Sequence, residues 1–192
     1  MTDPIVYRHR RTLGHGPPTN LYKGEIAYSD VNHTLHVGRP AEGIRDIGGA
    51  ACFVRQQNPQ GQNGGTFTAG AWRTRPLNTL TGNKSFCEIL NDGSLQLAPG
   101  DYEVFGWATT LAVKSHRTRL IMANSDVLLW GDSAYANSWV ESRSFLAGRF
   151  SLTSQAAVRL EHRCIKTRTA WGFGYRSNFG PEIYAQLTLN KY

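Results

Sequence analysis

The side chains best suited to recognition chemistry in this chain are aromatic and basic residues in glycine-rich, loop-like segments. Trp139 lies in Ala-Asn-Ser-Trp-Val, and Trp171 lies in Ala-Trp-Gly-Phe-Gly, just before Tyr175 and Arg176. An aromatic ring offers a flat apolar face to a sugar ring, and a neighbouring guanidinium adds charge. We therefore predict a glycan contact at Trp139, Trp171, Tyr175 and Arg176. Core packing is the expectation for the other tryptophans, Trp72, Trp107 and Trp130.

Catalytic and metal chemistry have weaker support. Asp126, Asp132 and Glu141 could form the acid and base pair of a glycosidase, but solvated loop carboxylates are the favoured interpretation. No serine-hydrolase elbow, phosphate loop or dinucleotide fingerprint occurs. His33 and His36 have the spacing of two metal ligands, yet no second pair accompanies them. The sequence therefore predicts neither catalytic residues nor a metal or other cofactor.

The charge of the chain favours an anionic partner. The formal net charge is +7, and the sequence pI is about 9.6. Most basic residues are dispersed and do not alternate with aromatic residues as in nucleic-acid modules, so we expect a polyanionic surface rather than nucleic acid as the partner. The one concentrated cluster is Tyr7, Arg8, His9, Arg10 and Arg11, and it predicts a docking arm.

The cellular setting is predicted from what the sequence contains. It shows no secretion signal and no apolar run long enough to span a membrane, so we expect no membrane insertion. Cys52, Cys87 and Cys164 are odd in number and widely spaced, which indicates free core cysteines made in a reducing cytosol. A disulfide with one spare thiol is the alternative.

Alternating apolar and polar residues predict an all-β protein. In the last segment Ile183, Ala185, Leu187 and Leu189 share one face, as in a half-buried strand. About nine or ten such segments follow the polar run 56–65, a number that suits a jelly-roll sandwich. A hairpin is expected over 24–38. We therefore expect an N-terminal arm and hairpin over 1–50 and a sandwich over 51–192.

Several motifs resemble those of a known family. They are Gly-Gly-Thr-Phe-Thr-Ala-Gly-Ala-Trp-Arg-Thr-Arg-Pro-Leu-Asn (64–78), Leu-Ala-Pro-Gly-Asp-Tyr (97–102), Ser-Arg-Ser-Phe-Leu-Ala-Gly-Arg-Phe (142–150), Leu-Glu-His-Arg-Cys (160–164) and Asn-Phe-Gly-Pro-Glu-Ile-Tyr (178–184). In this order they resemble the C-terminal β-sandwich of bacteriophage and prophage tail-fibre and spike proteins. The hairpin Gly-Glu-Ile-Ala-Tyr, with its partner Leu-His-Val-Gly, resembles a module near the start of phage fibre proteins.

The resemblance implies a jelly roll like those of tumour necrosis factor and complement C1q, assembled as a homotrimer. It implies a non-enzymatic virion protein, synthesised in the host bacterial cytoplasm and placed on the virion surface. Residues Tyr7 to Arg11 would anchor it to a capsid, portal, neck or tail protein, and the sandwich would contact a host surface glycan. Because the chain has no long shaft, a capsid-decorating head fibre without a receptor role is one alternative. A surface polysaccharide hydrolase is the other.

Overall fold

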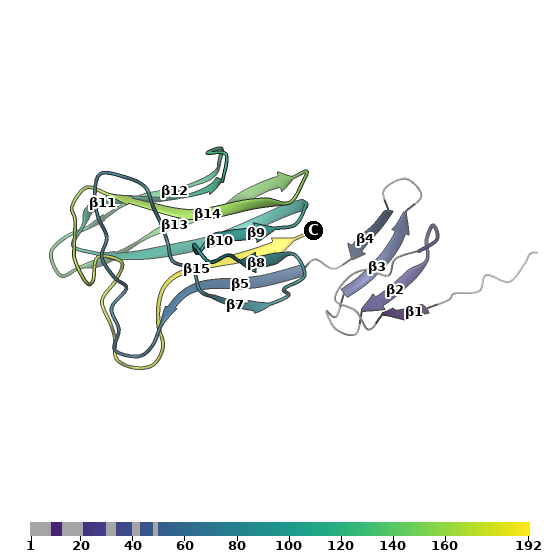
Figure 1. Cartoon of the computed structure of the whole chain (residues 1–192), viewed down its shortest axis with the longest axis horizontal. Coiled ribbons are helices and arrows are strands. Elements are labelled where there is room, and N and C mark those ends of the chain that lie inside the picture. Colours follow the sequence, from purple (N-terminus) through teal and green to yellow (C-terminus); the bar gives the residue numbers. More distant parts are fainter. Residues whose placement is uncertain (1–8, 13–20, 30–33, 40–42, 48–49) are drawn as a thin grey trace, which may run out of the picture. The chain divides into compact units, whose positions relative to one another are not determined.

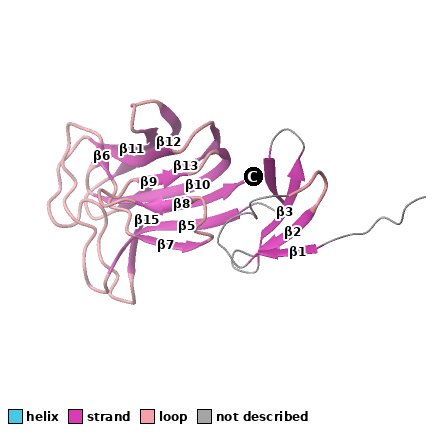
Figure 2. Cartoon of the chain, turned by 45° about the vertical axis from the view of Figure 1, so that its right-hand side comes forward, coloured by secondary structure: helices cyan, strands magenta, loops and turns pink. Residues whose placement is uncertain are grey.

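Every regular element that the structure describes is a β-strand (Figure 2). The computed structural model describes residues 9–12, 21–29, 34–39, 43–47 and 50–192. The chain divides into two compact units, Met1–Ala50 and Ala51–Lys191. In the described ranges no helix is long and apolar enough to cross a membrane. The prediction of an all-β protein is therefore confirmed.

The N-terminal unit contains a small four-stranded sheet. Its strands are β1 (His9–Thr12), β2 (Ile26–Ser29), β3 (Thr34–Arg39) and β4 (Gly43–Ile47), in the order β1-β2-β3-β4. The antiparallel pair β2 and β3 is the hairpin that the sequence predicts. Strand β1 pairs parallel with β2, and β4 pairs antiparallel with β3. Because an isolated hairpin is marginally stable, these two flanking strands give it the hydrogen-bonded neighbours it needs.

The second unit is a sandwich of two sheets (Figure 1). The first sheet has the order β13-β10-β15-β5-β7, and the second has the order β12-β11-β14-β9-β8, with β6 also paired to β14. The strands of the first sheet are β5 (Ala50–Asn58), β7 (Thr79–Gly82), β10 (Gly100–Leu111), β13 (Glu141–Leu152) and β15 (Glu182–Lys191). Those of the second are β6 (Arg73–Thr74), β8 (Cys87–Ile89), β9 (Leu95–Leu97), β11 (Lys114–Met122), β12 (Val127–Ala136) and β14 (Ala156–Cys164).

The strand order defines a jelly roll. The eight framework strands follow the chain as β5, β9, β10, β11, β12, β13, β14 and β15. Counted in this order from one to eight, the strands β13-β10-β15-β5 of one sheet are numbers six, three, eight and one. The strands β12-β11-β14-β9 of the other sheet are numbers five, four, seven and two. This interleaving of early and late strands is the double Greek key of a jelly roll. The predicted fold class is thus confirmed by the topology of the chain itself.

The core lies between the two sheets, where alternate residues of each strand point inward. Leu95, Leu120 and Leu160 of the second sheet face Leu187 and Leu189 of the first, all of them fully buried. The three cysteines are free and buried, as the sequence predicts. A side-chain hydrogen bond between Cys52 and Cys87, together with burial, raises the pKa of the Cys52 thiol. These cysteines therefore act as small apolar residues of the core.

Two strands differ from their sequence patterns. Tyr184 is buried although alternation placed it on the polar face of the last strand, because its ring packs against Gly174 and its hydroxyl donates to the Gln62 carbonyl at 2.7 Å. Strand β12 runs from Val127 to Ala136, and its residues do not alternate regularly between a buried and an exposed face. A register shift between β11 and β12 near Trp130 interrupts the alternation there.

The two ends of the sandwich are different. The chain enters at the start of β5 and leaves at the end of β15, and these points lie at the same end of the first sheet (Figure 1). Register shows that Tyr102 pairs with Lys191 at this end, whereas Leu111 pairs with Glu141 at the other. The opposite end, called the loop end here, carries the segments 59–64, 137–140 and 165–181.

Candidate functional site

The loop end brings together three of the four residues predicted to contact glycan. The rings of Trp139 and Trp171 stack with their centroids 6.1 Å apart, and Tyr175 meets Trp171 edge-on at 6.4 Å. Trp139 comes from the turn between β12 and β13, whereas Trp171 and Tyr175 come from the long connection between β14 and β15. Trp139 is 75% exposed, which is unusual for so large an apolar side chain. We call Trp139, Trp171 and Tyr175 the loop-end aromatic cluster.

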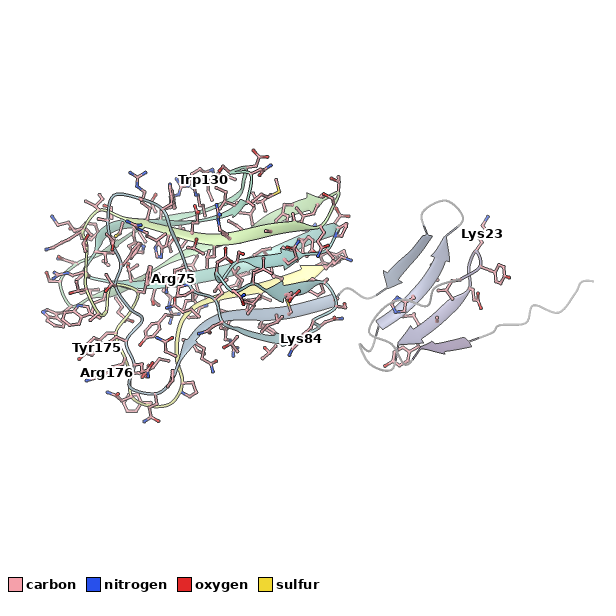
Figure 3. All side chains as sticks on the ribbon, viewed as in Figure 1. Lys23, Arg75, Lys84, Trp130, Tyr175 and Arg176 are labelled. Carbon is pink, nitrogen blue, oxygen red and sulfur yellow. The ribbon has the colours of Figure 1, made fainter. Side chains whose placement is uncertain are left out.

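Arg176, the fourth predicted residue, holds two loops together. Its Nη1 donates to the Gly61 carbonyl at 3.0 Å, and its backbone N–H donates to Asn63 Oδ1 at 3.1 Å. Figure 3 shows Tyr175 and Arg176 next to each other at this end of the sandwich. Arg176 therefore follows Tyr175 directly in the chain, and its guanidinium uses part of its donor capacity within the protein.

Glu182 fixes the loop that carries Tyr175 and Arg176. Its carboxylate accepts hydrogen bonds from the backbone N–H groups of Ser177, Asn178 and Gly61, and from the Ser177 hydroxyl. These donors, led by the Ser177 N–H, lower the pKa of Glu182 to about 2. The sequence gives no sign of this role because the donors are backbone groups. Phe179, at the tip of the same loop, is 95% exposed.

Behind the loop end, the Arg75 guanidinium is fully buried between the sheets (Figure 3). It donates to three backbone carbonyls, those of Thr109, Phe173 and Tyr184, at 2.8 to 3.3 Å. It also lies 4.1 Å from the centre of the Phe173 ring. Burial lowers the pKa of Arg75 to about 9. This side chain links β10, β15 and the 165–181 connection.

Beside Arg75, the side chains of Ser142, His116 and His162 are linked in a row. The first two resemble a catalytic nucleophile and its general base. His116 Nε2 lies 2.5 Å from Ser142 Oγ, and His116 Nδ1 lies 3.0 Å from His162 Nε2. Burial lowers the pKa of His116 to about 4 and also lowers the pKa of His162 well below its usual value. A base with so low a pKa accepts a proton poorly near neutral pH, so the arrangement suits cross-linking of β11, β13 and β14 better than catalysis.

The predicted acid and base candidates each bind a different structural partner. Asp126 lies in the turn after β11, which is at the opposite end of the sandwich from Glu141. Asp132 accepts the Phe145 N–H at 2.7 Å, and Glu141 accepts the Tyr175 N–H. Each carboxylate therefore has a local structural partner, and the glycosidase interpretation gains nothing from the geometry.

The structure describes only part of the predicted docking arm. Residues 9–11 belong to strand β1, so this part of the arm is a sheet strand and not a free extended segment. Tyr7 and Arg8 lie outside the described residues, as does His33. Within the described ranges, no group of three or more His, Cys, Asp or Glu side chains could hold a metal ion. His36 is buried in the small sheet.

The first sheet has an exposed aromatic face that was not predicted from the sequence. Phe105 of β10 is 51% exposed and Phe145 of β13 is 41% exposed, with their ring centroids 6.3 Å apart. Phe53 of β5 is also exposed. Trp107 is half-buried under the Arg143 guanidinium, 4.3 Å from the ring centre. We call Phe53, Phe105, Trp107 and Phe145 the aromatic face. Alternation along β10 could have shown it, because Phe105 and Trp107 alternate with the buried Val104 and Ala108.

The other two tryptophans lie on the second sheet. Trp72 is half-buried and Trp130 is 50% exposed, and Trp107 belongs to the aromatic face, so the expectation of core packing fails for all three. The Trp130 ring lies 5.8 Å from that of Trp72. The register shift in β12 turns Trp130 to the outer face, and a pattern of alternating residues does not reveal such a shift.

Comparison with known proteins finds similarity in structure alone. No family model matches the sequence, and no curated protein matches it. Among solved structures, the chain is similar to murine APRIL at pH 5.0, with a TM-score of 0.49 and 12% identity over 75% of this chain and 99% of that one. It is also similar to the globular domain of the zebrafish complement 1qA protein, with a TM-score of 0.49 and 14% identity over 74% and 96%. A third is the Eiger TNF of S. frugiperda, with a TM-score of 0.45 and 12% identity over 75% and 92%. The jelly-roll assignment rests on the strand order of the chain.

Proposed function

We propose that this chain is a non-enzymatic structural protein of a tailed phage or a phage-like particle. In this proposal residues 1–50 join it to another virion protein, and the sandwich forms a homotrimer on the virion surface that contacts a host glycan. The resemblance of its motifs to phage fibre and spike sandwiches points to this setting. The observation that carries the proposal is the exposed aromatic face on one sheet of a jelly roll.

The aromatic face is suited to self-association. Phe53, Phe105 and Phe145 are apolar and exposed on the outer face of the first sheet, where water contact is unfavourable. The ion pair between Arg149 and Glu103 lies beside them and provides a polar rim. Three copies arranged about an axis would bury these rings and close the assembly without free interfaces.

The loop-end aromatic cluster is suited to glycan contact. It lies at the end of the sandwich opposite the one where the chain enters and leaves. A sandwich attached through its N-terminal side therefore presents Trp139 and Phe179 away from the point of attachment. Trp139 and Tyr175 are exposed and Trp171 is half-exposed between them, so their rings provide an apolar face, and the neighbouring residue Arg176 adds the charge that suits a surface saccharide.

Light scattering and host-cell binding with one set of variants test both surfaces. We expect the parent chain to have a mass of about 64 kDa, three times 21.3 kDa. Phe105→Asp with Phe145→Asp should give monomers, because charges cannot be buried unpaired at an interface. Trp139→Ala should keep the mass and reduce host-cell binding, by about tenfold or more for a central aromatic contact.

Each variant is the control for the other. A parent chain that is monomeric would overturn the trimer, and normal cell binding by Trp139→Ala together with Trp171→Ala would overturn the glycan contact. Release of reducing ends from host polysaccharide would instead favour the hydrolase. A trimer that decorates heads but never binds cells would favour the head fibre without a receptor role.

A further inference from the structure

A groove on the second sheet lies apart from both surfaces described above. It has a volume of about 540 Å³ and opens on the outer face of β11, β12 and β14, within the size range of small-ligand sites. None of its lining residues belongs to the loop-end aromatic cluster or to the aromatic face. Its lining includes the aromatic rings of Trp72, Trp130 and Tyr135, the guanidinium groups of Arg117 and Arg163, and the apolar side chain of Ile165.

Strand register places rings and guanidinium groups side by side in this groove and next to it, where Arg119 lies. Arg119 pairs with Trp130, and Arg117 pairs with both Ser133 and Arg163, so all of these residues project from the same face. The Arg117 guanidinium lies 4.9 Å from the centre of the Trp130 ring, and the Arg119 guanidinium lies 4.2 Å from that of Trp72. Figure 3 shows Trp130 projecting outward from the sandwich. The groove is therefore built from alternating apolar planes and fixed positive charges.

The charge of the groove is not balanced. Arg119 forms an ion pair with Glu161 at 2.7 Å, and Arg159 also reaches Glu161 at 3.5 Å. Among the described residues, no ion pair engages Arg117 or Arg163, and both are exposed. Arg117 Nε donates to the Gly131 carbonyl at 2.7 Å. This bond orients the guanidinium and leaves its two terminal nitrogens available to an anion.

These features together specify a ligand. A planar guanidinium with two available nitrogens matches a carboxylate in a bidentate arrangement, and the exposed indole of Trp130 matches the apolar face of a sugar ring. Tyr135 and Ile165 extend the apolar wall. A single strand of nucleic acid needs a basic track of about four nucleotides or more, which is longer than a groove of this volume provides. We propose that this groove binds an acidic saccharide, with the sugar ring on Trp130 and its carboxylate on Arg117.

Calorimetry with the purified full chain tests the proposal without a virion or host cell. The probes are trigalacturonate, maltotriose as a neutral trisaccharide, and a short oligothymidylate. We expect trigalacturonate to bind and maltotriose to bind at least about tenfold more weakly, because only the first offers a carboxylate to Arg117. Trp130→Ala and Arg117→Met should each weaken trigalacturonate binding by about tenfold or more.

The controls are two arginines of the other sheet, outside the groove and outside the loop-end aromatic cluster. Arg143→Met removes a guanidinium stacked on Trp107, and Arg149→Met removes an exposed guanidinium. Both should bind trigalacturonate like the parent. Arg117→Lys keeps the charge but loses the planar fork, so it should bind weakly while retaining the fold, checked by its circular dichroism.

Several results would overturn the proposal. One is that trigalacturonate does not bind, or that maltotriose binds as tightly as trigalacturonate. Another is that the control variants lose as much affinity for trigalacturonate as Trp130→Ala and Arg117→Met do. A third is that the oligothymidylate binds more tightly than trigalacturonate, and that its binding is lost in Trp130→Ala. None of them bears on the mass of the assembly, so failure here is distinct from failure of the proposed virion role.

Discussion

His116 and His162 link the stability of the sandwich to pH. Burial lowers the pKa of His116 from 6.5 to about 4, and that of His162 also falls. Between these pH values the unfolded chain binds more protons than the folded one, so the free energy of unfolding falls as the pH drops. Below the folded pKa of about 4, protonation of His116 causes no further loss in the free energy of unfolding.

We predict that His116 alone lowers the free energy of unfolding by about 2 kcal/mol between pH 7.5 and pH 5, and that His162 acts in the same direction. Urea unfolding at intermediate pH values measures this loss. His116→Gln should be less stable at pH 7.5 but should depend less on pH over the same range. An unchanged pH dependence in that variant would show that His116 does not titrate as its burial implies.

Arg75 gives a second prediction for a single residue. Arg75→Met leaves the buried carbonyls of Thr109, Phe173 and Tyr184 without this donor, so we expect a loss of about 3 kcal/mol or more. Arg149→Met is the matched control, because Arg149 is exposed and its ion pair with Glu103 contributes about 1 kcal/mol at most. Equal losses in the two variants would contradict a structural role for the buried guanidinium.

At the scale of elements, the connection between β14 and β15 depends on Glu182. The pKa of Glu182 is about 2 in the folded protein, so the stabilisation by its carboxylate is complete above the unfolded value of 4.5 and is lost as the pH falls toward 2. The carboxylate holds segments 59–64 and 175–181 together through the N–H groups of Gly61, Ser177 and Asn178.

We predict that Glu182→Gln loosens the loop end while the sheets stay intact. Hydrogen exchange should become faster at the Ser177 and Asn178 amides but not at β10 amides, because the amide side chain provides one acceptor oxygen without charge. Glu88→Gln, at an exposed site on β8, is the control. Acidification of the parent from pH 5 to pH 3 should reproduce the effect, and protection that is unaffected by either change would argue against this anchor.

At the scale of the whole molecule, the two units are proposed to have separate tasks. Deletion of Met1 to Pro18 removes the basic cluster and strand β1 but none of the sandwich. We predict a soluble, folded chain with the mass of the parent assembly that no longer joins particles. Sedimentation with purified particles measures its incorporation. If the truncated chain is incorporated normally, the anchoring role of Tyr7 to Arg11 is wrong.

Local pattern was enough to predict the fold class and much of the secondary structure. Alternation in the last segment identified Ala185, Leu187 and Leu189 as buried residues, and turn residues separated the strands. The hairpin of β2 and β3 followed from the same reasoning. These features depend on neighbours in the sequence, because side chains alternate between the faces of a strand whatever the rest of the chain does.

The arrangement of the candidate sites could be predicted only in part. The loop-like composition around Trp139 and Trp171 predicted exposure, but their stacking required two connections that are distant in sequence to meet at one end of the sandwich. The outward position of Trp130 depends on a register shift with β11. The burial of Arg75 depends on carbonyl groups from three other segments.

The sequence by itself therefore determined that the chain forms strands, which of their faces are apolar, and that its charge is basic. The tertiary structure alone decided the order of strands in the jelly roll, the partners of Arg75 and Glu182, and the groove between Trp130 and Arg117. The physical reason is that alternation and turn propensity act between residues close in the chain. Hydrogen bonds to backbone groups, strand register and packing across two sheets join residues about a hundred positions apart.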